Sequence, residues 1–342
     1  MAAERKLGVG IVGLGWVAGE HLKAWQANPH SEVVALCSRD RAKAEAWGRQ
    51  YGLQSQAYDD YETMLHDPRV DVVSICTRND QHAGQGIAAA QAGKHLLIEK
   101  PIAMNLEELR DLTRAIEQAG VHSETGFVLR WNPYFQIVRS LLDADVLGPV
   151  FYGEFDYISG NWPVWYSGFD WARTRAVGGS SYLVAGCHAV DAMRWFMPGE
   201  AVEVIALAGN FTGAFEYDPT ICSLVRFSSG AIAKCASIIE GNTPYTFNVR
   251  LNGAKGTLIN NRLTAHLIAG QTSWAEIPTV LPDTPQVSHH PFPGEVNDLA
   301  EAITNNRPAL VNIRDAFQTH EIIFAAEQSA ADGGRPVKLP LS

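Results

Sequence analysis

The stretch LGVGIVGLGWVAGEH, residues 7–21, decides the fold of the first part of the chain. It begins as a nearly uninterrupted apolar run, which is typical of a strand covered on both faces. Gly13 permits a tight turn after this strand, Gly15 lets a pyrophosphate approach the backbone, and the N-terminus of the next helix faces the phosphates. The stretch therefore predicts dinucleotide binding by Gly13, Gly15, Trp16, Val17 and Ala18, with Ala18 packing the helix onto the sheet.

The alternation of strand and helix continues to about residue 125. Further strand-like runs occupy residues 32–38, 70–77 and 95–99. Helical spacing occupies residues 17–28, 41–51, 61–65, 82–92 and 106–119. Strands that alternate with helices predict a parallel, doubly wound sheet with right-handed crossovers. We expect residues 1–125 to form a Rossmann dinucleotide-binding domain.

After residue 125 several strand-like segments follow one another with only short turns between them. They occupy residues 150–159, 202–211, 220–228, 231–239, 247–253 and 256–261. Helices are expected at 133–143 and after Gly294 and Asn312, and a last short strand in the tail. This pattern predicts an α/β domain, residues 126–342, around a large open sheet that is mainly antiparallel or mixed.

Composition excludes several classes of function. The chain has 342 residues, 46% of them hydrophobic, and a net charge of -10. This length suggests about two domains, and the acidic balance argues against nucleic acid and anionic membranes as partners. No apolar run approaches the roughly 20 residues of a membrane span, and the polar start is no secretion signal, so we expect a cytoplasmic protein. The five cysteines lack metal-site spacing, and we expect no metal.

The second predicted strand ends at Ser38-Arg39-Asp40. An acidic residue at this place would normally hold the adenosine ribose of NAD. Ser38 and Arg39 offer a hydroxyl and a cation instead, which suit a 2′-phosphate, although Asp40 could still reach the ribose. The local chemistry therefore favours NADP slightly over NAD, and Arg39 could also be a solvated loop charge.

Two further strand ends should reach the same edge of the sheet. CTRNDQH, residues 76–82, offers Thr77, Asn79 and His82 as dinucleotide contacts, although helix capping would also explain these residues. In HLLIEKP, residues 95–101, Glu99 and Lys100 follow the apolar run, and we place both beside the cofactor. By position alone, Lys100 could enter the site near the nicotinamide or simply pair with Glu99.

The glycine motif, CTRNDQH, Glu99-Lys100-Pro101 and GGSSYLVAGCHAVD (178–191) occur in order over nearly the whole chain. Together they resemble the glucose-fructose oxidoreductase and inositol dehydrogenase family, written Gfo/Idh/MocA. The resemblance implies an active-site Lys100 that stabilises developing alkoxide charge, and a cis peptide bond to Pro101. It also implies a homodimer or homotetramer formed through the C-terminal sheet.

The same resemblance identifies His188 as the proton acceptor, for which imidazole is suited because its pKa lies near neutrality. Many relatives carry Asp four residues earlier, where this chain has Val184. Asp191 is a candidate substitute, although an acid there also serves packing and structural hydrogen bonds.

Aromatic residues and hydroxyl-binding groups indicate the substrate class. Rings can lie against the apolar face of a sugar while Arg and Asn bind its hydroxyl groups, but a core or a subunit interface would use the same aromatics. The substrate-binding candidates, besides Lys100 and His188, are Arg130, Asn132, Tyr157, Trp165, Trp171, Arg173 and His290.

The predicted reaction is reversible hydride transfer between NAD(P) and a CH–OH group of a sugar, glycoside or cyclitol. Two alternatives stay open. One is sugar modification or glycoside cleavage with a recycled bound cofactor, and the other is a non-catalytic NAD(P)-binding regulator of a sugar pathway.

Overall fold

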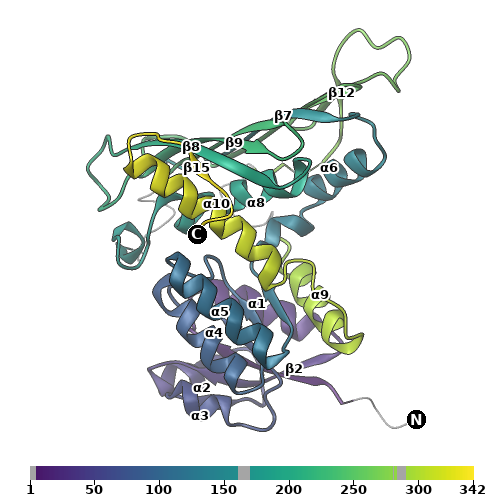
Figure 1. Ribbon diagram of the computed structural model, residues 1–342. Coiled ribbons are helices and arrows are strands. Elements are labelled where there is room, and N and C mark those ends of the chain that lie inside the picture. Colours follow the sequence, from purple (N-terminus) through teal and green to yellow (C-terminus); the bar gives the residue numbers. More distant parts are fainter. Residues whose placement is uncertain (1–4, 161–169, 280, 283–289) are drawn as a thin grey trace. The chain divides into compact units, whose positions relative to one another are not determined.

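The computed structural model describes residues 5–160, 170–279, 281–282 and 290–342 (Figure 1). The chain forms two compact units. Residues 1–128 and 291–317 belong to the N-terminal unit, and residues 129–290 and 318–342 belong to the C-terminal unit.

A six-stranded sheet forms the centre of the N-terminal unit. Its strands are β1 (Leu7–Val12), β2 (Ser31–Cys37), β3 (Gln56–Tyr58), β4 (Val72–Ile75), β5 (His95–Ile98) and β6 (Ser123–Thr125). They lie in the order β3-β2-β1-β4-β5-β6, and all five pairings are parallel. The order reverses between β1 and β4, which is where a doubly wound sheet binds its ligand.

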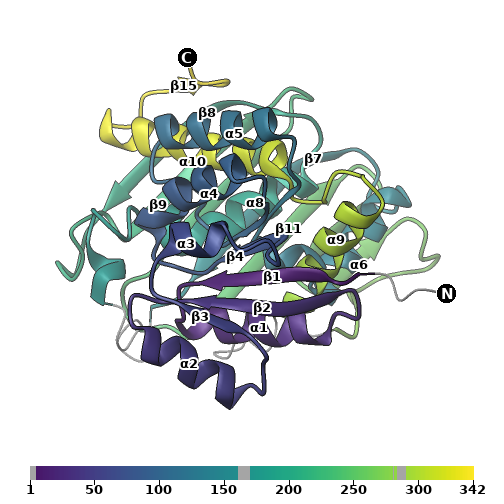
Figure 2. The same ribbon diagram turned by 90° about the horizontal axis from the view of Figure 1, so that it is seen from below.

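Helices cover both faces of this sheet. They are α1 (Trp16–Ala27), α2 (Arg41–Gln50), α3 (Tyr61–Leu65), α4 (His82–Gln91) and α5 (Leu106–Ala119). Figure 2 shows α1 and α2 on one side of the sheet and α4 and α5 on the other. Asn105 caps α5 by accepting the N–H of Glu108, and Gly120 ends that helix at φ 66°, which glycine adopts without strain.

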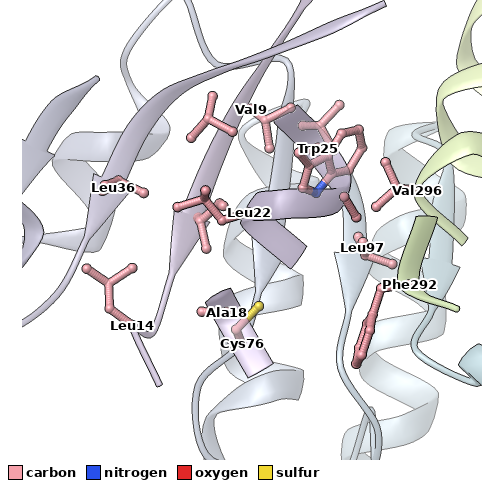
Figure 3. Close-up of a cluster of buried hydrophobic side chains, with 14 of the residues drawn as sticks. Val9, Leu14, Ala18, Leu22, Trp25, Leu36, Cys76, Leu97, Phe292 and Val296 are labelled. Atoms are coloured by element: carbon pink, nitrogen blue, oxygen red, sulfur yellow. The ribbon is translucent and has the colours of Figure 1, made fainter. Parts of the chain in front are cut away.

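A helix from far along the sequence completes the core of the N-terminal unit. Helix α9 (Phe292–Thr304) packs Phe292 and Val296 into the cluster that holds Trp25 and Leu97 (Figure 3). Both Trp25 and Val296 are fully buried. Because this packing joins α9 to α1, the unit is discontinuous in sequence, whereas we expected a single division near residue 125.

The C-terminal unit is built on a nine-stranded sheet. Its strands are β7 (Val150–Ile158), β8 (Ala201–Gly209), β9 (Thr220–Phe227), β10 (Ile232–Ile238), β11 (Thr246–Gly253), β12 (Gly256–Ile259), β13 (Arg262–Ala265), β14 (Ala275–Glu276) and β15 (Val337–Lys338). The order is β14-β13-β12-β11-β7-β10-β9-β8-β15. Among the described strands of this second sheet, β7 and β10 form the one parallel pair, so the sheet is mixed and mainly antiparallel.

Among its described residues, the C-terminal unit contains all of the α-helices α6 (Pro133–Asp143) and α8 (Cys187–Phe196) and the part of α10 (Ile313–Ala331) from Gln318 onward. Figure 1 shows α8 and this part of α10 on the same face of the sheet. None of the helices within the described residues combines the length and the apolar character of a membrane span.

The predicted elements exist with bounds that differ by a few residues, and the predicted fold class is confirmed. The short strands β3, β6, β13 and β14 were not predicted, whereas the helix expected around His188 is α8. Two- to four-residue strands are too short to show a period in the sequence, and they form because neighbouring strands supply their hydrogen-bond partners.

Candidate active site

The glycine turn between β1 and α1 has the geometry expected of a dinucleotide site. Gly13 has φ 84°, and a Cβ there would lie 2.7 Å from the backbone N and Cα of Thr77. A Cβ on Gly15, in contrast, would meet no atom within 4 Å. Packing within the protein therefore requires glycine at 13 but not at 15, where the open space leaves room for a ligand to approach the backbone.

The N-terminus of α1 is suited to hold phosphate. Gly15 is the N-cap and has no side chain to accept the first N–H groups, and the first turn has no acidic residue. The backbone N–H groups of Trp16, Val17 and Ala18 can thus donate to an anion, assisted by the helix dipole. Ala18 is fully buried against the sheet, as its predicted packing role requires.

The end of β2 leaves the adenosine side open to either dinucleotide. Asp40 is the N-cap of α2, and its carboxylate accepts the backbone N–H of Lys43 at 3.3 Å. Ser38 Oγ accepts the N–H of Asp40 at 3.3 Å, while Arg39 is exposed. The nearest acid therefore has a structural role in capping α2.

His82, which we expected to contact the dinucleotide, is buried with 1% of its surface exposed. Its Nδ1 lies 2.7 Å from the carbonyl oxygen of Pro101, and its Nε2 lies 3.0 Å from that of Thr77. Burial lowers the pKa of this imidazole. In this placement the ring joins the segments that follow β4 and β5, and the cofactor contact of His82 stays a prediction.

The two other residues predicted with His82 lie close to it. Thr77 follows β4 and its hydroxyl donates to Gln85 Oε1 at 2.7 Å. Asn79 is buried in the 3-10 turn η1 (Asn79–Gln81).

Lys100 follows directly after β5 and is half-buried. Because β1, β2, β4 and β5 are parallel, their carboxyl ends bring Gly13, Ser38, Thr77 and Lys100 to one edge of the sheet. The peptide bond between Lys100 and Pro101 is cis, as the family resemblance implied. Lys100 therefore lies at the sheet edge that carries the glycine turn between β1 and α1.

The carboxylate of Glu99 bonds both the backbone of Lys100 and the ring of His21. Its Oε2 accepts the backbone N–H of Lys100 at 3.1 Å, and its Oε1 lies 2.9 Å from Nε2 of His21. Glu99 is 7% exposed, and although burial opposes its ionisation, the hydrogen bond and charge of His21 lower its pKa. Glu99 thus bonds both His21 and the backbone of Lys100, and its contact with the cofactor stays a prediction.

His188 lies on α8 in the C-terminal unit and is 4% exposed. Its ring stacks on that of Tyr157 at a centroid distance of 6.5 Å and lies 5.8 Å from that of His290. Tyr157 in turn meets Tyr245 edge to face at 5.1 Å. Three of the predicted site residues, His188, Tyr157 and His290, are therefore brought together.

The segment before His188 departs from a regular helix. Residues Tyr182–Gly186 form a π-helical turn that leads into α8, and Val184 is buried in it. Such single π-turns are frequent at functional sites. A Cβ on Gly186 would lie 2.5 Å from the side chain of Ser237, so glycine allows this turn to approach β10 closely.

Asp191, the candidate substitute for the family acid that is absent at Val184, accepts three hydrogen bonds within the protein. Its carboxylate accepts two hydrogen bonds from Arg130, Nε at 2.8 Å and Nη2 at 2.7 Å, and a third from the hydroxyl of Thr319 at 3.0 Å. Arg130 is 2% exposed and lies over the ring of Trp195 at 5.2 Å. The geometry favours a structural role for Arg130 over the predicted contact with substrate.

The remaining substrate candidates have different placements. Asn132 is fully buried and caps α6 by accepting the N–H of Tyr134, which is again a structural role. Trp171 is half-buried, and Arg173 pairs with the exposed Asp170 at 2.6 Å. Trp165 lies outside the described residues.

Sequence reasoning missed two buried groups next to the predicted site. His21 belongs to the glycine motif itself, and Glu295 comes from α9, about 200 residues from Glu99 along the chain. A ring nitrogen of His21, a carboxylate oxygen of Glu99 and a carboxylate oxygen of Glu295 all lie within 4.8 Å of one another. The position of His21, eight residues after Gly13 on the inner face of α1, could have indicated a buried polar contact, whereas no local signal marks Glu295.

Comparison with known proteins places these features in a family. Residues 7–127 match the model of an oxidoreductase family with an NAD-binding Rossmann fold, and residues 139–339 match the C-terminal alpha/beta domain of the same family. Together the two matches cover most of the chain.

Individual relatives are more distant. The scyllo-inositol 2-dehydrogenase (NAD(+)) of Bacillus subtilis is 25% identical over 98% of this chain and 97% of its own. The D-apiose dehydrogenase of Paraburkholderia graminis is 28% identical over 78% of this chain and 74% of its own. A solved levoglucosan dehydrogenase, in complex with NADH and levoglucosan, shares the fold with a TM-score of 0.88 and 20% identity, covering 98% of this chain and 100% of its own.

Proposed function

Because the chain belongs to the Gfo/Idh/MocA oxidoreductase family, we propose that it transfers hydride between a nicotinamide dinucleotide and a CH–OH group of a sugar, glycoside or cyclitol. The observation that carries the proposal is the placement of Lys100 at the sheet edge that also bears the glycine turn. Relatives named as inositol and apiose dehydrogenases support the substrate class.

The chain's own groups fit the cofactor. The open space at Gly15 and the uncapped first turn of α1 accommodate a pyrophosphate. NAD(P), when bound, supplies the hydride acceptor or donor for the reaction.

Lys100 and His188 have different roles in the proposed reaction. In the oxidative direction the ammonium group of Lys100 hydrogen-bonds the reacting oxygen and stabilises its developing negative charge. The imidazole of His188 accepts the proton that the hydroxyl loses. The rings of Tyr157 and His290 both contact the imidazole of His188, and these contacts restrict how the imidazole can turn.

For the dinucleotide, we propose that Ser38 and Arg39 bind the 2′-phosphate of NADP by donating hydrogen bonds to it. The capping role of Asp40 supports this, since a carboxylate bonded to the N–H of Lys43 competes less well for a ribose diol. The NAD-linked relatives show that the family also uses NAD, so a chain that accepts both is consistent with the proposal.

We also propose that the chain forms a homodimer or homotetramer through the C-terminal sheet. Leu207 on β8, Leu224 on β9 and Ile232 on β10 are 66%, 54% and 44% exposed, and these three strands are neighbours. Exposed apolar side chains on adjacent strands are typical of an interface. Light scattering on the wild type and on Leu224→Glu tests this, with dissociation expected in the variant.

The test of the function is absorbance at 340 nm with purified protein, NAD or NADP in parallel, and a panel of free sugars, glycosides and inositols. A rising signal with any of these substrates supports the dehydrogenase. A flat trace with demonstrated dinucleotide binding contradicts it. Product analysis then separates a recycled bound cofactor, which converts sugar without net reduction, from a sensor that converts nothing.

A further inference from the structure

Three buried side chains, His21, Glu99 and Glu295, form a cluster beneath Lys100 within the N-terminal unit. His21 comes from α1, Glu99 follows β5, and Glu295 comes from α9, with 0%, 7% and 0% of their surfaces exposed. His21 Nδ1 lies 2.8 Å from Ser74 Oγ, and His21 Nε2 lies 2.9 Å from Glu99 and 3.5 Å from Glu295 Oε1. Glu99 Oε2 also accepts the backbone N–H of Lys100.

Glu295 is the member of the cluster whose charge is not balanced by hydrogen bonds. Neither of its carboxylate oxygens has a hydrogen-bond partner among the described residues. Packing holds it in place, because the neighbouring Phe292 and Val296 fill the core and Phe292 contacts the ring of His21 at 5.5 Å. A carboxyl group that is buried without hydrogen bonds is far more stable neutral than ionised.

The charges around the cluster also favour a protonated Glu295. The groups that face it are Ser74 in β4, Cys76 directly after β4, His82 at the start of α4, Lys100 after β5, and Glu124 in β6. Asp298 on α9 interacts in turn with Glu124. A charged His21 can balance only one ionised carboxylate. Because Glu99 takes this charge, an ionised Glu295 would not be balanced by His21. Burial raises the pKa of Glu295 to about 8, which agrees with a proton held there near neutrality.

We propose that Glu295 is a positioning residue for Lys100 that acts through His21 and Glu99. While Glu295 carries a proton, His21 pairs with Glu99 alone, and Glu99 Oε2 holds the N–H of Lys100. When Glu295 loses its proton to solvent, its carboxylate competes with Glu99 for His21, and the support of Lys100 loosens. The proposal rests on the proposed role of Lys100 in hydride transfer.

The first test follows protons and needs no substrate. Full-length protein labelled with ¹³Cδ-glutamate is titrated from pH 5 to pH 10 by NMR. We expect a carboxyl resonance that titrates near pH 8 in the wild type and is lost in Glu295→Gln. Glu301→Gln, an exposed change on the same helix, should leave that resonance in place. If no glutamate of the wild type titrates near pH 8, or if metal analysis finds one equivalent of a divalent ion bound by the wild type, the proposal is overturned.

The second test follows the backbone of Lys100. With ¹⁵N-lysine, assigned by its loss in Lys100→Met, the amide resonance of Lys100 should shift with the same midpoint as the Glu295 carboxyl in the wild type. It should not shift with that midpoint in Glu295→Gln. An amide that ignores pH in the wild type would show that Glu295 is structural only, and this result can be read from the wild type even if the variant fails to fold.

The third test uses turnover. With a substrate found at 340 nm, kcat of the wild type should fall as pH rises through about 8, and Glu295→Gln should move this fall by at least one pH unit, with the KM for the dinucleotide changed less than twofold. An unmoved profile overturns the positioning role. If no substrate is turned over, the proposed function fails, while the two NMR tests still decide whether Glu295 is coupled to Lys100.

Discussion

Arg130 and Asp191 provide a direct test of whether a predicted substrate residue is structural. We consider Arg130→Met, Asp191→Leu and the double variant. Each single change leaves one buried charge without its partner, whereas the double change removes both charges. The pair is 2% and 4% exposed and is bidentate, so solvent screens it little.

The expected magnitude follows from that burial. Breaking a buried ion pair from one side costs about 3–5 kcal/mol, because the remaining charge stays desolvated. Replacing both members with apolar groups is often close to neutral, so the double variant should be more stable than the sum of the two single changes predicts, by about 3 kcal/mol or more. An exposed change on α6, Asp143→Asn, alters the pair with Arg139 and should cost about 0–1 kcal/mol.

The assay must report on the C-terminal unit alone, because a chain of two units need not unfold in one step. Hydrogen exchange measured by mass spectrometry, with peptides that cover α6 and α8, gives the local free energy of opening. If both single variants keep that free energy within about 1 kcal/mol of wild type while raising KM for the substrate, Arg130 is a binding residue and the structural reasoning is refuted.

The remaining predictions concern catalysis, cofactor choice and pH. Lys100→Met should keep dinucleotide affinity, measured by calorimetry, and lower turnover by about 10²–10³-fold, as the loss of one oxyanion donor does; turnover within threefold of wild type would remove Lys100 from the chemistry. His188→Ala should lower turnover by about 10²–10⁴-fold, most clearly near neutral pH, and an unchanged pH–rate profile would exclude it as the proton acceptor. Ser38→Asp should shift the ratio of kcat/KM toward NAD, since a carboxylate repels the 2′-phosphate, and a constant ratio would place the discrimination elsewhere. Glu295→Gln should change the pH dependence of stability: burial raises the pKa of Glu295 from 4.5 to about 8, so the wild type progressively loses stability as pH rises between these values. At about 1.4 kcal/mol per pKa unit, the variant should gain about 2 kcal/mol relative to wild type between pH 6 and pH 8 in urea unfolding; parallel curves would show that Glu295 is not held protonated.

The two halves of the chain differ in how much their sequences revealed. In the N-terminal unit the apolar runs are continuous and the glycine motif constrains the backbone itself, so the order of elements and the place of Lys100 followed from local pattern. In the C-terminal unit the strands could be located but not ordered. The parallel pairing of β7 with β10 depends on contacts between segments about 80 residues apart.

The candidate site shows the same limit at the level of side chains. Motifs in the sequence indicated Lys100 and His188 as site residues. They did not indicate which parts of the protein would surround Arg130, Asn132 and His82. Each was predicted to bind a ligand, and the structure shows each of them buried and hydrogen-bonded to other parts of the protein. A sequence names the donor groups but does not say whether another part of the chain will use them.

The sequence by itself determined the doubly wound fold of the N-terminal unit, its glycine turn and the lysine after β5, because these depend on neighbouring residues and on the steric freedom of glycine. Only the tertiary structure decided that α9 completes that unit and brings Glu295 to His21 and Glu99. The physical reason is that burial and charge pairing arise between residues far apart in the chain, and apolar packing of Phe292 and Val296, rather than any local motif, carries that carboxyl group into the core.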